Sequence, residues 1–187
     1  DVFALNAPYD GGTHLPDITV IKPIFNNLKD EILFFVAARG HHTDVGGLTP
    51  GSMPPDSRVI EDEGVYIDNF KLVENGLFKK TEISNLLLGA KHPVRALSKN
   101  LADLRAQVAS CEKGEMELRN LITAYGISVV KKYTKFVHSN ASEMVKSILK
   151  SIKPTSYTYH MDKDIRIPQP KKNYYFNFDF ILFYFLF

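Results

Sequence analysis

The spacing of the apolar residues changes near residue 80, and this change constrains the fold more than any other feature of the sequence. Before it, short apolar runs alternate with turn residues, and the runs VFALN, ITVIKPIF and EILFFVAA are rich in β-branched and aromatic residues. Such runs favour strands. After it, apolar residues recur every three or four positions, as in helices that bury one face. Strands followed by helices predict an α+β fold.

The first forty residues predict neighbouring strands. We expect residues 18–25 and 31–39 to form an antiparallel pair. The run EILFFVAA is continuous and of strand length, which predicts burial on both faces. Further along, Glu74-Asn75-Gly76 is a turn signal between two short strand-like pieces.

The helical part begins with KKTEISNLLLGA, which predicts a short helix that ends at Gly89. Asn100 is a plausible N-cap for the next helix, which would end at Gly126. Gly114 lies inside that helix and costs about 1 kcal/mol relative to alanine, so a break at this point is an alternative.

A second long helix is predicted to begin at Ser128 and to end near Ile152. Its apolar residues share one face: Val130, Tyr133, Val137, Ala141, Met144 and Ile148. The short YGIS junction between the two helices predicts an antiparallel hairpin. The expected fold is therefore a set of mixed N-terminal strands, a Gly/Pro-rich loop and a long helical hairpin.

Composition excludes several classes of function. The 187 residues suffice for one domain or part of a larger one, and a net charge of +2 gives no reason to expect nucleic acid or an anionic membrane as partner. The single cysteine, Cys111, rules out an internal disulfide and suits a reducing compartment. No signal peptide is visible, and the abrupt start at Asp1 suggests a fragment.

Two short segments carry the groups with reactive chemistry. In RGHHTDVGGLTPGSMPPDS, His41, His42 and Asp44 come before glycines and prolines that forbid regular structure, which predicts a shaped loop. In GGTHLPD, His14 and Asp17 lie in the turn between the first two strands. Imidazoles and carboxylates bind metal ions or transfer protons.

The predicted strand pairing brings the two segments together. If strands 18–25 and 31–39 are antiparallel, the start of one lies beside the end of the other, so His14, Asp17 and His41 would converge. Two imidazoles and a carboxylate suit Mn, Fe or Zn with positions left open to water. His42 and Asp44 would complete or orient this set. The alternative is that each histidine is a turn residue bonded to backbone.

Each of the other candidate functional residues also has a purely structural explanation. Glu63 is a possible ligand or base, but it also fits a solvated charge run. Asp103 and Gln107 share a helix face and would either face a substrate or pair on the surface. Cys111 fits a small core residue better than a nucleophile. No G-x-x-x-x-G-K-[ST] phosphate loop is present, so the sequence shows no place for ATP.

Four longer motifs carry a family resemblance. In this order, LNAPYDGGTHLPD, RGHHTDVGGLTPGSMPPDS, EGVYIDNFKLVENGLF and NLADLRAQVASCEKG resemble the hydantoinase B/oxoprolinase family. The form GGLTPGSMPPDS, with FKLV and NLADLRAQ after it, looks most like the family's eukaryotic ATP-dependent oxoprolinase branch. The resemblance covers roughly residues 1–152.

This resemblance implies a hydrolase of the glutathione cycle in the cytoplasm, which opens 5-oxo-L-proline to L-glutamate with ATP. It implies a divalent metal on His14, Asp17 and His41. It also implies that ATP and Mg bind an upstream nucleotide-binding half that this sequence lacks, so the segment alone would be inactive. The full-length enzyme would be a homo-oligomer. The alternatives are a relative acting on hydantoins or carboxylating a ketone, and a non-catalytic remnant or interaction module.

The C-terminal segment differs from the rest. We expect residues 1–153 to form a partial domain of this family and residues 154–187 to be a divergent, non-native tail. Nine of the last fourteen residues are Phe or Tyr. The run is too short for a transmembrane helix, which needs roughly 20 apolar residues.

Overall fold

The computed structural model describes residues 1–152, together with the backbone of 157–160 and 173–176. It divides into two compact units, Asp1–Leu118 and Arg119–Phe187. The first contains an antiparallel sheet, and a long helical region follows, so the α+β class is confirmed. In the described part, none of the helices combines the length and the apolar character that crossing a membrane requires.

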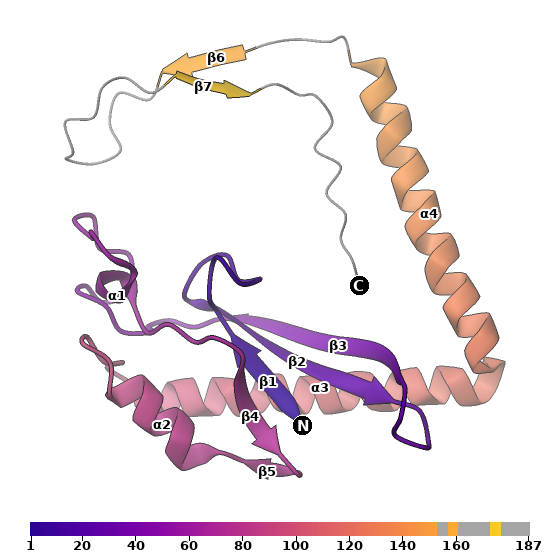
Figure 1. The fold of residues 1–187 in the computed structure, drawn as a ribbon, viewed down its shortest axis with the longest axis horizontal. Helices are drawn as coiled ribbons and strands as arrows, with labels where there is room; N and C mark the ends of the chain where they lie inside the picture. Colours follow the sequence, from indigo (N-terminus) through magenta and orange to yellow (C-terminus); the bar gives the residue numbers. More distant parts are fainter. Residues whose placement is uncertain (153–156, 161–172, 177–187) are drawn as a thin grey trace. The chain divides into compact units, whose positions relative to one another are not determined.

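The sheet of the first unit has five antiparallel strands in the order β3-β2-β1-β4-β5 (Figure 1). The strands are β1 (Val2–Leu5), β2 (Asp17–Phe25), β3 (Ile32–His41), β4 (Phe70–Glu74) and β5 (Leu77–Phe78). The predicted turn at Asn75-Gly76 joins the last two, and both its residues have positive φ angles of 51° and 78°. Type I′ hairpin turns require such angles.

Strands β2 and β3 are antiparallel neighbours, as predicted, with Asp17 paired to His41 at the end of the ladder. The expectation that β3 is buried on both faces is wrong, because none of its residues is buried. It is the edge strand, and only Val36 and Ala38 pack against the core. The opposite face stays open, and Phe35 is 55% exposed.

The first unit has three helices, α1 (Ile60–Glu63), α2 (Lys80–Leu88) and α3 (Leu97–Tyr125), of which α3 extends past residue 118. Helix α3 runs along the other face of the sheet (Figure 1), and α2 and α3 both contribute buried residues to the core. Helix α2 ends before Gly89, as predicted. The buried face of α3 carries residues at three- and four-residue spacing: Asn100, Leu101, Leu104, Gln107 and Cys111.

Two details predicted for α3 are wrong. Asn100 is not the N-cap, since the helix begins at Leu97 and the Asn100 side chain is buried inside it. The helix also runs unbroken through Gly114. A Cβ at this position would lie 2.7 Å from Val36 Cγ1, so glycine lets the helix lie close to β3.

The second long helix, α4 (Ile127–Ser151), follows Gly126, whose φ of 81° suits glycine. It begins just before the predicted Ser128, and none of its residues is buried. The antiparallel packing of α3 and α4 stays a prediction. Strands β6 (Tyr157–His160) and β7 (Asn173–Phe176) form a separate antiparallel pair, while residues 177–187 of the aromatic tail lie outside the described residues.

Candidate metal centre

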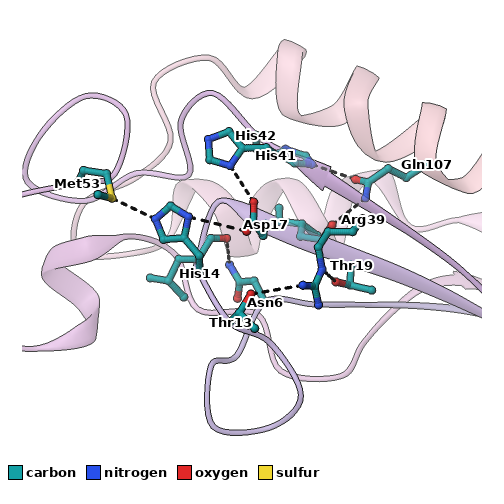
Figure 2. A network of polar contacts seen from close by, with 12 residues as sticks. Asn6, Thr13, His14, Asp17, Thr19, Arg39, His41, His42, Met53 and Gln107 are labelled. Carbon is teal, nitrogen blue, oxygen red and sulfur yellow. Dashed lines mark hydrogen bonds and ion pairs between the residues drawn. The ribbon is translucent and has the colours of Figure 1, made fainter. Parts of the chain in front are cut away.

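Three side chains from both predicted segments converge at one end of the β2–β3 pair (Figure 2). His14 lies in the loop before β2, Asp17 is the first residue of β2 and His41 is the last residue of β3. The antiparallel register places Asp17 directly opposite His41. Opposite residues point to the same face of a sheet, so the two side chains meet there.

The donor atoms of this cluster all lie within 4.8 Å of one another. His41 Nδ1 is 2.7 Å from Asp17 Oδ1, and His14 Nδ1 is 4.0 Å from Asp17 Oδ2. The two imidazole rings stack with centroids 5.7 Å apart and planes 24° from parallel. The side chains of His14, Asp17 and His41 are 39%, 28% and 64% exposed, so the cluster is open on one side.

This arrangement fits a divalent transition ion. Two imidazoles and one carboxylate are ligands that Zn, Fe and Mn accept, and three protein ligands leave positions for water or substrate. The hydrogen bond between His41 and Asp17 would give way to the ion, since a ligand nitrogen must be unprotonated.

A buried asparagine shapes the loop that carries His14. Asn6 is fully buried, and its Nδ2 donates to the carbonyl oxygens of Leu15 and Val65, each at 2.9 Å. Its Oδ1 accepts from the Ile67 N–H at 2.7 Å. These bonds tie the loop to the segment on its other side. His14 Nε2 also lies 3.1 Å from Sδ of Met53, a residue of the Gly/Pro-rich loop.

His42 lies apart from the cluster. It is 1% exposed and faces α3, where Asn100 Nδ2 donates to its Nδ1 at 3.2 Å and its Nε2 lies 3.0 Å from Gln107 Oε1. Because Asn100 donates to Nδ1, the ring proton belongs on Nε2. Both ring nitrogens thus have partners on α3.

Asp44 also has other partners. It accepts from the N–H groups of Gly46 at 3.0 Å and Gly51 at 3.1 Å, and Arg95 Nη1 lies 2.7 Å from its Oδ2. Burial raises the pKa of the Asp44 carboxyl, but the N–H groups of Gly46, Gly51 and Arg95 and the Arg95 guanidinium outweigh it and bring the pKa below its ordinary value. Asp44 therefore organises the loop.

The loop after Asp44 depends on close backbone approaches. A Cβ on Gly46 would lie 2.2 Å from the His92 carbonyl oxygen, and one on Gly47 would lie 2.5 Å from that of Glu63. The Ser52 hydroxyl accepts from the Val45 N–H and donates to the Gly46 carbonyl oxygen. The glycines thus let the loop fold tightly beside the cluster.

The remaining candidates lie on helices. Glu63 is exposed at the end of α1, and its Oε1 accepts from the Ser57 hydroxyl at 3.1 Å. Asp103 is half-buried on α3. Gln107 is buried, and its Nε2 donates to the carbonyl oxygens of Ile18 at 2.8 Å and Ala38 at 2.9 Å. None of the three belongs to the His14–Asp17–His41 cluster.

Sequence reasoning missed the roles of three residues that hold the loops and strands of this site: Asn6, Arg39 and Asn100. Asn6 and Asn100 act through buried bonds to distant segments, which no local pattern reveals. Arg39 was recognisable, because it lies two positions before His41 in the predicted strand and so shares its face.

The chain is similar to known proteins along most of its length. The family model of hydantoinase B/oxoprolinase matches residues 1–180. The chain belongs to the hydantoinase B/oxoprolinase family. The match includes part of the segment 154–187 that was set apart above, so a boundary at residue 153 stays a prediction.

Relatives within the family agree with this assignment. The chain is 47% identical over 160 residues to 5-oxoprolinase 1 of Arabidopsis thaliana, covering 81% of this chain and 12% of that one. It is 38% identical over 197 residues to 5-oxoprolinase of Saccharomyces cerevisiae, covering 96% of this chain and 15% of that one. The chain therefore spans a small part of each relative.

A solved structure has the same fold. The ATP-dependent caprolactamase from Pseudomonas jessenii superposes with a TM-score of 0.72 at 28% identity, covering 86% of this chain and 27% of that chain. The cluster described above lies within the residues that the family model matches.

Proposed function

We propose that this chain forms the metal-binding part of an ATP-dependent hydrolase that opens 5-oxo-L-proline to L-glutamate. The observation that carries the proposal is the convergence of His14, Asp17 and His41 in a chain of this family. Its curated relatives include 5-oxoprolinases that match at 38–47% identity. A role in glutathione metabolism and a cytoplasmic location belong to the same proposal.

The chemistry divides between this chain and the part of the protein outside it. ATP phosphorylates the lactam oxygen and ADP leaves; water then adds to the activated carbon, and the ring C–N bond breaks as the ring nitrogen takes up a proton. A second water hydrolyses the resulting acyl phosphate to the side-chain carboxylate of L-glutamate and inorganic phosphate. The ATP and Mg belong to a nucleotide-binding region elsewhere in the protein. A metal ion bound by this chain would act as a Lewis acid or activate a water.

The residues of this chain hold and orient that site. Asp17 and His41 are fixed opposite each other by the strand register, and Asn6 fixes the loop of His14. Glu63, Asp103 and Gln107 remain candidate catalytic residues from the sequence. Of these, Glu63 is exposed and could meet a substrate held by the rest of the protein.

The rival functions predict different products. A hydantoinase-type or ketone-carboxylating relative would act on another small molecule, and a non-catalytic interaction module would act on none. The open positions of the cluster favour the catalytic alternative, because a purely structural metal site is usually closed by four protein ligands.

The test is an assay of the full-length protein that contains this chain. We expect ATP-dependent formation of L-glutamate from 5-oxo-L-proline. We expect its rate to fall in His14→Ala and His41→Ala by at least the roughly ten- to a hundredfold that losing a hydrogen-bond partner of a metal ligand costs. His138→Ala, which changes an exposed histidine on α4, is the matched control. Unchanged turnover in both cluster variants, or no glutamate from the wild type, would contradict the proposal.

A further inference from the structure

Arg39 lies beside the cluster on the same face of the sheet. It is two residues before His41 on β3, so both side chains point the same way. Its cross-strand partner is Thr19, and its Nε donates to Thr19 Oγ1 at 3.0 Å. Its Nη1 donates to Thr13 Oγ1 at 3.4 Å (Figure 2). Thr13 directly precedes His14, so the loop and both strands contribute to this second group.

Within residues 1–152 the Arg39 charge has no counterion. Among the described residues, no carboxylate lies within ion-pair distance of its guanidinium, whereas Arg95 is paired to Asp44 at 2.7 Å. Arg39 is exposed, and none of the described residues accepts a hydrogen bond from its Nη2. An arginine held by two neutral hydroxyls keeps its full charge for an external anion.

The two threonines add donors to this group. Each hydroxyl oxygen accepts a hydrogen bond from Arg39, so its own proton is directed elsewhere. Thr19 is 8% exposed, which fixes its position, while Thr13 is exposed. A guanidinium edge with a hydroxyl on either side suits the planar oxygens of a carboxylate.

We propose that Arg39, with Thr13 and Thr19, binds the carboxylate of the substrate while the neighbouring cluster faces the amide. This inference rests on the proposed function and deepens it. It assigns to Arg39 the discrimination between a cyclic amide that carries a carboxylate and an uncharged lactam. The alternative is that Arg39 only ties the Thr13 loop to the sheet, in which case its removal would weaken both kinds of ligand equally.

The test compares two ligands that differ only in the carboxylate, 5-oxo-L-proline and 2-pyrrolidinone, in the full-length protein. We expect the wild type to bind the first more tightly. In Arg39→Met, the dissociation constant and the Michaelis constant for the carboxylate-bearing ligand should both rise about ten- to a hundredfold, as expected for a lost charge-assisted bond. Binding of 2-pyrrolidinone and metal content should not change.

Two further variants keep the outcome clear. Arg39→Lys keeps the charge without the planar fork and should recover part of the loss. Arg105→Met removes an exposed arginine that lies over the Phe78 ring and should change neither ligand. Equal weakening of both ligands in Arg39→Met, or no preference for the carboxylate in the wild type, would overturn the proposal. If the protein binds 5-oxo-L-proline more tightly than 2-pyrrolidinone through Arg39 but forms no L-glutamate, the carboxylate site is supported and only the proposed reaction is contradicted.

Discussion

His41 and His42 are neighbours in the chain but point to opposite sides of the sheet. His41 is 64% exposed and bonds Asp17, while His42 is 1% exposed and bonds α3. Successive side chains alternate along a strand, so one histidine belongs to the cluster and the other to the packing beneath it. The sequence suggested that both histidines bind the same metal ion, but because they are neighbours only His41 can belong to the cluster.

At the same scale, Asp44 should make stability depend on pH. Its pKa is lowered in the folded protein, so its stabilising contribution is complete above the ordinary carboxyl pKa of about 4 and is lost as the pH falls through the lower folded value. We expect Asp44→Asn to destabilise the protein by about 1–3 kcal/mol at pH 7, because it removes the ion pair with Arg95.

Urea unfolding at pH 7 and pH 3 would measure this difference. The gap between Asp44→Asn and the wild type should narrow at pH 3, which lies below the ordinary carboxyl pKa, because the unfolded wild-type chain then gains a proton that the folded Asp44 resists. Glu82→Gln, at an exposed carboxylate on α2, is the control. A gap of the same size at both pH values would show that the Asp44 charge does not stabilise the loop.

At the scale of elements, α3 is joined to the β2–β3 pair by polar bonds as well as apolar packing. Gln107 donates to carbonyl groups of both strands and contacts His42. Cys111 lies one turn further, with its Sγ 3.7 Å from the Val20 carbonyl oxygen. A helix held at two successive turns fixes the strand pair on which the cluster depends.

Gln107→Leu should therefore lower the free energy of unfolding by about 1–3 kcal/mol, because it leaves buried polar groups without partners. Asp103→Asn, one turn earlier and half-buried, should change it far less. Thermal or urea unfolding measures both. A Gln107→Leu protein of wild-type stability with impaired turnover would instead support the catalytic role predicted for Gln107 from the sequence.

The contact of Gly114 with Val36 gives a second prediction for the same element. Gly114→Ala should destabilise the protein even though alanine favours a helix by about 1 kcal/mol, because the added methyl group would collide with Val36 Cγ1. In a Val36→Ala background the same change should stabilise it. A double-mutant cycle of unfolding free energies measures the difference. The same effect in both backgrounds would contradict the close contact.

The strands, turns and helix ends were predicted well from the sequence where they depend on patterns of a few neighbouring residues. Strand pairing, the Asn75-Gly76 turn and the end of α2 followed from periodicity and turn chemistry. The same register brought His14, Asp17 and His41 together. The predicted burial of β3 was wrong, because an apolar run does not show whether its strand lies at the edge of a sheet. The predicted N-cap role of Asn100 was wrong, because an asparagine in a sequence does not show whether its hydrogen-bond partners are local or distant.

At the scale of the whole molecule, the chain spans 12% and 15% of the two 5-oxoprolinases compared above. The face of the sheet that carries the cluster and Arg39 is open in the described unit, and Phe35 is 55% exposed on the same strand. The helix α4 has an amphipathic sequence and no buried residue. In the unit Asp1–Leu118, the side chains of His41, Arg39 and Phe35 are thus accessible on one face of the sheet.

This division of roles predicts that the 187-residue chain binds metal but does not hydrolyse ATP by itself. The sequence has no phosphate-binding loop of the G-x-x-x-x-G-K-[ST] type to hold a nucleotide. Phosphate release would be measured for this chain and for the full-length protein, each with 5-oxo-L-proline. Activity only in the full-length protein is expected, and substrate-dependent turnover by the short chain would contradict it.

Elemental analysis of the purified chain tests whether His14, Asp17 and His41 hold one metal ion. We predict one equivalent of Mn, Fe or Zn in the wild type and in His138→Ala, and loss of that metal in His14→Ala and His41→Ala. Circular dichroism would establish that each variant keeps its helices. Wild-type metal content in the two cluster variants, or a folded wild-type chain that takes up no metal, would show that these three residues do not form a metal site.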